Sequence, residues 1–221
     1  MQGITCNGNQ IVAVLLILFG LQGHLPTELG LLTNVEYFDF SSNMMSGTVP
    51  TQVGNLRAYS FDARNAVFLS GTIPAELCEV TSMNRLQWGN TRVSGTLPAE
   101  VGKLQSMKFD VSLAGTQMSG TLPTQLGLWT NLENGLNLHG AALSGAIPTE
   151  LGALKKLSDL DVGGNQLSGT LPSQLVLRRG YPRFGRAPRD RPVASAAVRT
   201  AVLMRAPADA GSRAARYNTT G

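Results

Sequence analysis

Aliphatic residues recur at fixed positions in a unit of about 24 residues that repeats along most of the chain. The unit is easily counted from a series of prolines, which follow one another at intervals of 24, 24, 24, 25, 25 and 24 residues. These prolines are Pro26, Pro50, Pro74, Pro98, Pro123, Pro148 and Pro172. An aliphatic residue directly precedes each proline, and another follows it by three positions. Because one such unit cannot bury its apolar side alone, the pattern predicts stacked copies whose apolar columns form one continuous core.

Each unit also contains a short segment in which apolar and polar residues alternate, which is the period of a strand with one buried face. The clearest copy reads LxxLxxLxLxxNxL over residues 154–167, and residues 32–45 match it. Equivalent strands of stacked units lie side by side. The pattern therefore predicts a parallel β-sheet.

The third unit does not fit the strict spacing of 24 residues, which would place Asp62 and Arg64 in the core. A shift by one residue places Tyr59, Phe61 and Ala63 inward instead. We expect the shifted register, because burying two charged side chains costs far more than burying these three.

A glycine lies three residues before every proline of the series. These glycines are Gly23, Gly47, Gly71, Gly95, Gly120, Gly145 and Gly169. Glycine permits backbone angles and close approaches that a side chain would forbid, whereas proline fixes φ and removes an N–H that would otherwise need a partner. The glycine and proline of each unit are therefore predicted to form the same corner in every coil.

The run LxxLxxLxLxxNxLSGTLPxxLGxL resembles the plant-specific class of leucine-rich repeats, found in receptor-kinase ectodomains and in secreted inhibitors of cell-wall polygalacturonases. The resemblance covers residues 3 to about 176. It implies an α/β repeat solenoid, a right-handed superhelix of about seven repeats with a parallel β-sheet on the concave face. Gly3-Ile4-Thr5-Cys6 also resembles the end of the family's N-terminal cap, although Met1 stands at the cap's Trp position and the cap's upstream cysteine is absent.

The family stacks asparagines at the turn after the strand, where their side chains satisfy backbone groups. In this chain Asn43 and Asn165 keep that position. The residues that replace asparagine in other units are Phe19, Thr91, Thr116 and Ala141. A buried backbone group without a partner costs ~1 to 3 kcal/mol, so we expect the central coils to be looser than a consensus solenoid unless water takes the place of the amide.

Three segments follow from these patterns: a remnant of an N-terminal cap over residues 1–10, a repeat domain over 11–177, and a disordered tail over 178–221 that is rich in Arg, Ala and Pro. Residues 1–175 hold 8 basic and 12 acidic residues, whereas residues 176–221 hold 10 Arg and 2 Asp. The formal net charge of +4 thus comes from the tail. Nucleic-acid binding is not expected, because it needs a basic stripe on the folded part. The tail also carries a glycosylation acceptor pattern at Asn218-Thr219-Thr220.

The apolar run 11–19 is too short to cross a bilayer, which takes ~20 residues, and it lacks the flanking residues of a signal peptide. We predict it to be a buried strand, so no membrane span is expected in this chain, although the full-length protein could be membrane-anchored.

Cys6 and Cys78 are too few and too far apart to indicate a disulfide framework or a metal site. His24 and His139 belong to no catalytic constellation. Neither an enzyme nor a cofactor is expected.

Recognition is the function that the repeats favour, because a rigid curved sheet presents outward residues that can vary without touching the core. The candidate ligand-binding residues are those at the outward positions of the predicted strands. They are Asp39, Ser41, Gln87, Ser112, Asn137, His139 and Asp161, and the shifted register adds Asp62. We expect a protein, peptide or glycoprotein ligand. The resemblance implies an extracellular or cell-surface setting.

Two alternatives stay open at this point. One is a secreted inhibitor of a cell-wall hydrolase, which the family resemblance also allows. The other is an ice-binding solenoid, an activity that some plant repeats of this family have. It would use a column of threonines that is interrupted by Ala146 and consists of Thr48, Thr72, Thr96, Thr121 and Thr170.

Overall fold

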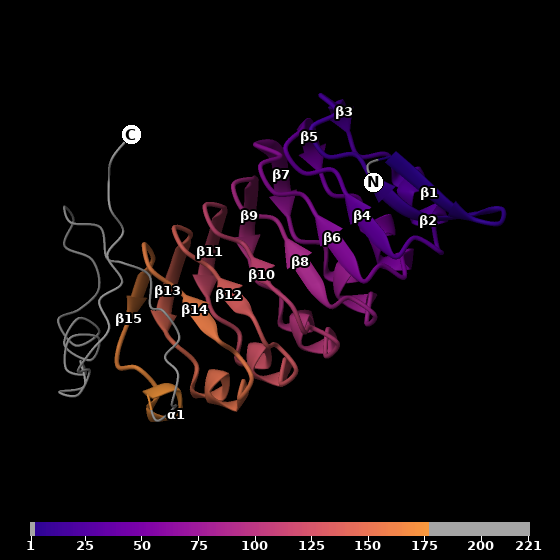
Figure 1. The fold of residues 1–221 in the computed structure, drawn as a ribbon. Helices are drawn as coiled ribbons and strands as arrows, with labels where there is room; N and C mark the ends of the chain where they lie inside the picture. The colour runs from indigo at the N-terminus through magenta and orange to yellow at the C-terminus, as the bar shows by residue number, and fades with distance from the viewer. Residues whose placement is uncertain (1–2, 177–221) are drawn as a thin grey trace, which may run out of the picture.

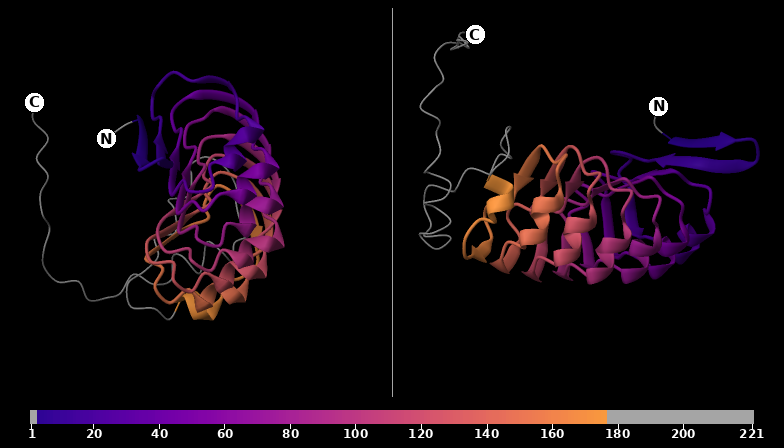
Figure 2. Two further views of the ribbon diagram at one scale, coloured as in Figure 1. Left: turned by 90° about the vertical axis from the view of Figure 1, so that its right-hand side faces the viewer. Right: turned by 90° about the horizontal axis from the view of Figure 1, so that it is seen from below.

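The computed structural model describes residues 3–176, which form a curved stack of seven coils (Figures 1 and 2). The predicted tail over 178–221 lies outside the described residues, as does the end of the predicted repeat domain at residue 177. Each coil contributes one strand to each of two sheets and a short helical turn between them. The fold is the predicted leucine-rich-repeat solenoid.

An eight-stranded sheet lines the concave face. In spatial order its strands are β1 (Gly3–Asn7), β2 (Gln10–Leu15), β4 (Tyr37–Asp39), β6 (Ser60–Asp62), β8 (Arg85–Gln87), β10 (Val111–Ser112), β12 (Gly135–Asn137) and β14 (Asp159–Asp161). β1 pairs with β2 in antiparallel fashion, and every later pair is parallel. We number the coils 1 to 7 after β2, β4, β6, β8, β10, β12 and β14.

A seven-stranded parallel sheet follows the turn after each concave strand. Its strands are β3 (Gln22–His24), β5 (Met44–Thr48), β7 (Phe68–Thr72), β9 (Arg92–Thr96), β11 (Gln117–Thr121), β13 (Ala142–Ala146) and β15 (Gln166–Ser168). Short helices complete the coils, namely the 3₁₀ turns η1 (Thr27–Leu31), η2 (Thr51–Asn55), η3 (Ala75–Glu79), η4 (Ala99–Lys103), η5 (Thr124–Leu128) and η6 (Thr149–Ala153), and the α-helical turn α1 (Ser173–Val176). The proline of the repeat directly precedes each 3₁₀ turn, where its missing N–H leaves no backbone donor unsatisfied.

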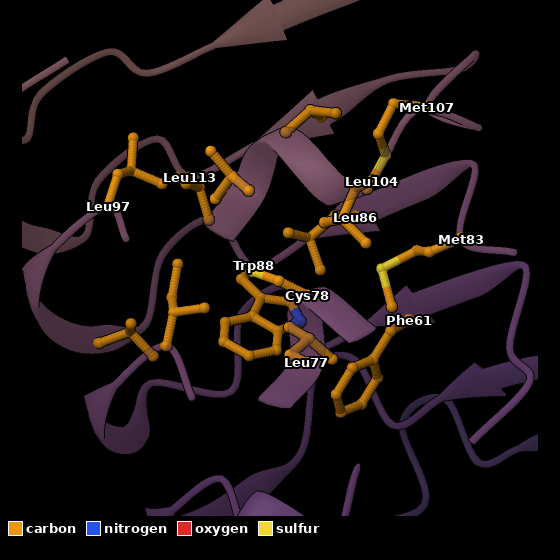
Figure 3. Close-up of a cluster of buried hydrophobic side chains, with 14 of the residues drawn as sticks. Phe61, Leu77, Cys78, Met83, Leu86, Trp88, Leu97, Leu104, Met107 and Leu113 are labelled. Atoms are coloured by element: carbon orange, nitrogen blue, oxygen red, sulfur yellow. The ribbon is translucent and has the colours of Figure 1, made fainter. Parts of the chain in front are cut away.

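The core consists of apolar columns that run through the stack, as predicted (Figure 3). The central residues of the concave strands are at most 6% exposed and comprise Val14, Phe38, Phe61, Leu86, Val111, Leu136 and Leu160. Trp88 packs edge-on against Phe61 with ring centroids 5.3 Å apart. Ala63 holds the position equivalent to Trp88 in the preceding coil. Because Ala63 is small, the core between these two coils has room for the large indole of Trp88.

The shifted register of the third unit is confirmed, because Phe61 pairs in register with Phe38 and both Phe61 and Ala63 are fully buried. The prediction for Tyr59 is wrong, since this side chain is 39% exposed. The fully buried Ala58 fills the inward position before the strand. The phenol of Tyr59 is therefore left outside the core, beside Tyr37.

The prediction of one buried strand over residues 11–19 is also wrong at its end. The strand β2 stops at Leu15, and Leu18 and Phe19 are 73% and 51% exposed. Leu18 has a φ of 60°, the same left-handed conformation that Asn65 and Asn90 adopt in later coils. The turn after each concave strand adopts this conformation, which places the Leu18 side chain outside the core, like those of Asn65 and Asn90. The left-handed turn does not account for Phe19, because the equivalent residue Asn43 is buried after the same turn.

The corner glycines are needed for close packing between coils. Gly71 has a φ of +82°, and a β-carbon on it would lie 2.6 Å from Cγ2 of Thr48 in the preceding coil. Gly120 is in the same position, 2.7 Å from Cγ2 of Thr96. The corner therefore excludes side chains both by its backbone angles and by the approach of the preceding coil.

The asparagines bond one coil to the next, as the resemblance implied. Asn165 donates from Nδ2 to the carbonyl oxygens of Leu138 and Val162, and its Oδ1 accepts from the backbone N–H of Leu143. Thr91 and Thr116 replace only part of this set, because each hydroxyl donates to the carbonyl oxygen three residues earlier within its own coil. The bond to the preceding coil is missing at both positions.

Candidate ligand-binding face

The strand ends of the concave sheet carry most of the residues predicted to contact a ligand. Strand register aligns them in one line across coils 2 to 7, which we call the concave row. The concave row consists of Asp39, Asp62, Gln87, Ser112, Asn137 and Asp161. Ser41 and His139 follow this row by two residues, at the turns of their coils. The fold thus brings the predicted residues onto one surface.

Exposure differs among these residues. Asp39, Ser112, Asn137, Asp161 and His139 are half-buried and reach solvent. Ser41 and Gln87 are only 5% and 8% exposed, so they offer a ligand little surface. Gln87 uses its side-chain amide within the protein, donating from Nε2 to the carbonyl oxygen of Asp110 at 3.0 Å.

Four residues of the concave row have one oxygen already engaged. Asp39 Oδ1 accepts a hydrogen bond from the backbone N–H of Ser41 at 2.9 Å, and Asp161 Oδ1 accepts from that of Gly163 at 2.9 Å. Asp62 and Asn137 make the same bond two residues ahead, at 3.0 Å each. This is the local turn bond that Asp and Asn side chains form. One oxygen shapes the turn, and the second carboxylate oxygen of Asp39 and Asp161 stays available to a ligand.

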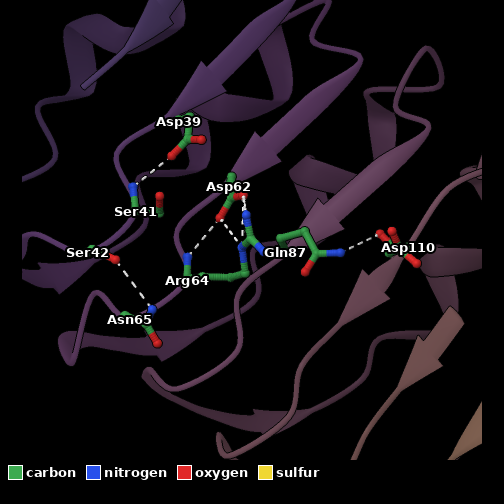
Figure 4. Close-up of polar contacts among 8 residues, drawn as sticks. All are labelled: Asp39, Ser41, Ser42, Asp62, Arg64, Asn65, Gln87 and Asp110. Atoms are coloured by element: carbon green, nitrogen blue, oxygen red, sulfur yellow. Dashed lines mark hydrogen bonds and ion pairs between the residues drawn. The ribbon is translucent and has the colours of Figure 1, made fainter. Parts of the chain in front are cut away.

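Asp62 differs from the others because it is paired with a cation (Figure 4). Arg64 donates from Nε to both carboxylate oxygens at 3.0 Å and from one terminal nitrogen to Oδ2 at 2.7 Å. The Asp62 side chain is 6% exposed and that of Arg64 is 52% exposed. The pKa of Arg64 is raised, first by the hydrogen bond to Asp62 and further by the charges of Asp62, Asp39 and Asp110. A fixed positive group therefore lies on an otherwise acidic face.

Sequence reasoning missed Arg64 and Asp110 as residues of this face. The one-residue shift that moved Asp62 outward also moves Arg64 outward, so the signal was present in the sequence. Asp110 lies directly before β10, and its Oδ1 accepts from the backbone N–H of Gly135 at 3.2 Å. Its place at the first outward position of an alternating segment could have indicated it as well.

The other end of the face carries His139 and Asp161. The imidazole Nδ1 of His139 lies 3.3 Å from Oδ1 of Asp161 in the next coil. Gly89 and Ala114 hold the positions equivalent to Arg64 and His139 in the two coils between them. Their side chains are small and project little from the sheet. The face therefore offers polar groups at both ends with small residues between them.

The threonine column lies elsewhere, along the ends of the seven-stranded sheet, where Thr170 follows β15 by two residues and the other four threonines each end a strand. Its members Thr48, Thr72, Thr96, Thr121 and Thr170 are all exposed. The serines two residues earlier turn their hydroxyls inward, since Ser70, Ser94 and Ser144 each donate to a glycine carbonyl oxygen of the preceding coil. This surface is thus a regular array of methyl and hydroxyl groups.

The described residues were also compared with the requirements of a metal site, a reactive thiol and a membrane span. Residues 3–176 hold no group of three or more His, Cys, Asp or Glu arranged for a metal ion. Cys6 and Cys78 are both free thiols. Burial raises the pKa of Cys78 to about 11, so this thiol is protonated at neutral pH and is a poor nucleophile. Within the same range, no helix has the length and apolar character that crossing a bilayer requires.

Comparison with known proteins shows what the chain is similar to. No protein-family model matches the chain. Over 54 residues, 24% of this chain and 4% of the relative, the sequence is 37% identical to LRR receptor-like serine/threonine-protein kinase GSO2 of Arabidopsis thaliana. The crystal structure of the GASSHO1/SCHENGEN3 ectodomain of Arabidopsis thaliana, solved with CASPARIAN STRIP INTEGRITY FACTOR 2, aligns with a TM-score of 0.71 and 30% identity, covering 79% of this chain and 21% of that one. The Arabidopsis receptor kinase HAESA, solved with the peptide hormone IDA and the co-receptor SERK1, aligns with a TM-score of 0.68 and 29% identity, covering 74% of this chain and 28% of that one.

The chain has the leucine-rich-repeat fold, and its sequence and structure are similar to those of plant leucine-rich-repeat receptors. It spans only a small part of the curated relative that it matches, 4% of GSO2. This relative is a receptor-like kinase, and the two similar structures are of plant receptor kinases, the first of them an ectodomain.

Proposed function

We propose that this chain is a non-catalytic recognition scaffold that binds a protein, peptide or glycoprotein ligand through its concave face. The observation that carries the proposal is the concave row itself. Asp39 and Asp161 each hold one carboxylate oxygen in a turn and offer the other to solvent, on a sheet whose register fixes their positions. Such preorganised acceptors lose little side-chain freedom when they bind a ligand.

The similar structures support this proposal. GASSHO1/SCHENGEN3 was solved with CASPARIAN STRIP INTEGRITY FACTOR 2, and HAESA was solved with a peptide hormone and a co-receptor. By analogy we propose that this chain works outside the cell or at the cell surface, as part of a receptor-like protein. The alternative of a secreted hydrolase inhibitor stays a prediction from the family resemblance.

A selection experiment tests the proposal. A displayed library of short random peptides is selected on the purified chain, and the enriched peptides are assayed against a variant that carries Asp39→Asn and Asp161→Asn. Asparagine keeps the oxygen that accepts the turn bond, so the fold is retained while both charges are lost. We expect the variant to bind the enriched peptides at least about tenfold more weakly, the equivalent of ~1.4 kcal/mol.

The matched control replaces two threonines of the other sheet, Thr48→Ala and Thr96→Ala, and should leave peptide binding unchanged. Circular dichroism and the unfolding midpoint establish that both variants are folded. If the Asn variant bound as well as the unmodified chain, the concave row would not be the binding surface. Failure to enrich any peptide with saturable binding would count against recognition of peptides altogether.

We also propose ice binding as a second candidate, because the structure exposes the threonine column on a parallel sheet. Equally spaced threonine methyl and hydroxyl groups form a regular surface of the kind that can order water. The test is an ice-recrystallisation assay on the purified chain and on the Thr48→Ala, Thr96→Ala variant. Slowed crystal growth that the variant loses would support this function, and unaltered growth with the unmodified chain would exclude it.

A further inference from the structure

Exposed aromatic and cationic side chains gather where the concave strands begin, apart from the concave row. We call this surface the strand-start rim, and it consists of Tyr37, Tyr59, Arg85, Lys108 and Phe109. Tyr37 and Tyr59 are 48% and 39% exposed, and Phe109 is half-buried. Single exposed apolar residues are ordinary, but tyrosine and arginine gathered on one surface are typical of the energetic centres of protein interfaces.

Backbone hydrogen bonds place these residues side by side along the stack. The carbonyl oxygen of Tyr59 accepts from the N–H of Arg85 at 3.1 Å, which joins coil 3 to coil 4. The carbonyl oxygen of Asn84 accepts from the N–H of Phe109 at 2.9 Å and from that of Lys108 at 3.1 Å, which joins coil 4 to coil 5. The rim is therefore continuous and held by the sheet rather than by a free loop.

The two halves of the rim have different chemistry. At one end, the rings of Tyr37 and Tyr59 meet edge to face, with centroids 6.2 Å apart and an interplanar angle of 70°. At the other end, the guanidinium carbon of Arg85 lies 5.4 Å from the centroid of Phe109, and Lys108 Nζ lies 5.6 Å from the same centroid. An apolar platform thus adjoins a stacked cation.

Arg85 is free to accept an anionic partner. Its side chain forms no ion pair or hydrogen bond with any residue in the range 3–176 that the structure describes. Asp110 is the neighbouring residue in the next coil, and its Oδ1 accepts instead from Gly135. The stack on Phe109 restrains the guanidinium plane, and a restrained guanidinium fork matches the two oxygens of a carboxylate.

Charge in the surroundings favours the same partner. Glu133 is the only carboxylate paired with Lys108 among the described residues, and it lies 3.9 Å from both Lys108 and Lys156. Two lysines share one carboxylate, so this group keeps a net positive charge beside Arg85. The rim's own residues thus carry two cations and no carboxylate, on a repeat body that is acidic in total, and Glu36 and Asp110 flank the rim.

We infer that the strand-start rim anchors an acidic residue of a peptide or protein ligand, with an apolar side chain of that ligand packed on the tyrosine pair. The inference rests on the proposed function and specifies the ligand's chemistry. A peptide fits better than a sugar ring, which needs an open aromatic face. Tyr37 and Tyr59 partly cover each other, and the cations of Arg85 and Lys108 lie over Phe109.

Arg85→Gln tests the anchor, and Arg92→Gln is its matched control. Arg92 makes the same kind of stack, 5.2 Å from the centroid of Phe68, but on the seven-stranded sheet. Peptides enriched on the unmodified chain should carry Asp or Glu near an aromatic or aliphatic residue. They should bind Arg85→Gln at least about tenfold more weakly and Arg92→Gln equally well. A peptide whose acidic residue is changed to its amide should bind weakly to the unmodified chain and lose no further affinity on Arg85→Gln.

The outcomes separate this inference from the proposed function. Peptides that bind Arg85→Gln like the unmodified chain, but fail to bind the Asp39→Asn, Asp161→Asn variant, overturn the rim as anchor and leave the concave row standing. Full additivity of the peptide change and Arg85→Gln would also overturn it, because the two groups would then not be in contact. If no peptide is enriched, the proposed function and this inference fail together.

Discussion

The side-chain amide of Asn43 donates a hydrogen bond to the carbonyl oxygen of Leu16, 27 residues earlier and one coil away, at 2.6 Å. The same Nδ2 donates to the carbonyl oxygen of Phe40, and Oδ1 accepts from the backbone N–H of Leu21. One side chain therefore satisfies backbone groups on two coils. The link holds coil 1 against coil 2 near the exposed residues Leu18 and Phe19.

Removal of this link should destabilise the N-terminal coils. We expect Asn43→Ala to lower the free energy of unfolding by about 3 kcal/mol, because several backbone groups that water reaches poorly lose their partner. Asn131→Ala is the control. Its exposed side chain accepts a hydrogen bond only from Lys156 among the described residues, and its φ is not positive, so the change should cost no more than ~0.5 kcal/mol. Urea denaturation measures both, and equal losses would show that the buried amide has no special role.

Gly71→Ala should destabilise the protein for two separable reasons. The new β-carbon would meet Cγ2 of Thr48 at 2.6 Å, and alanine is strained at a φ of +82°. We expect a loss of about 2 to 3 kcal/mol in total. Adding Thr48→Ser removes the clashing methyl but not the backbone strain, so it should recover part of the loss and leave ~1 kcal/mol. Thermal unfolding of the single and double variants would measure this, and failure of the serine to recover anything would exclude the steric term.

The two buried tryptophans should respond differently to phenylalanine. Trp129 donates from Nε1 to the carbonyl oxygen of Val101 at 2.8 Å, whereas Trp88 Nε1 has no hydrogen-bond partner among residues 3–176. Both substitutions remove a similar volume, but Trp88→Phe also relieves an unpaired buried donor. We expect Trp88→Phe to cost at least ~1 kcal/mol less than Trp129→Phe in denaturant unfolding. The reverse order would show that packing around Trp88 outweighs its unpaired N–H.

Cys78 should make stability depend on pH in the alkaline range. Burial raises its pKa from the ordinary 9.0 to about 11, so the folded protein holds the thiol proton more tightly than the unfolded chain. The resulting stability is complete below pH 9.0 and is lost as the pH rises to about 11. The loss is at most about 2 to 3 kcal/mol. Cys78→Ala should flatten this decline between the two pH values, and an unchanged slope would assign the decline to other groups.

Sequence periodicity predicted the solenoid, the corner glycines and the position of the candidate face, because each repeat independently reports the same pattern. It also chose the correct register for Phe61 and Ala63. It misplaced Tyr59, since Ala58 is small and gives no strong apolar signal at the inward position that it fills. It ended the first strand too late, because Leu18 and Phe19 are apolar and composition does not reveal the left-handed turn at Leu18.

The sequence by itself determined the number and spacing of coils, since burying one aliphatic ridge against the next is possible only when the units are alike. Tertiary structure decided what the outward residues do. Asp39, Asp62 and Asp161 look equivalent in the sequence, yet Arg64 neutralises one of them, and His139 lies beside another. The stack on Phe109 that restrains Arg85 comes from a different coil, about one repeat later in the chain. Such contacts depend on distances between coils, and the spacing of residues along one repeat does not contain them.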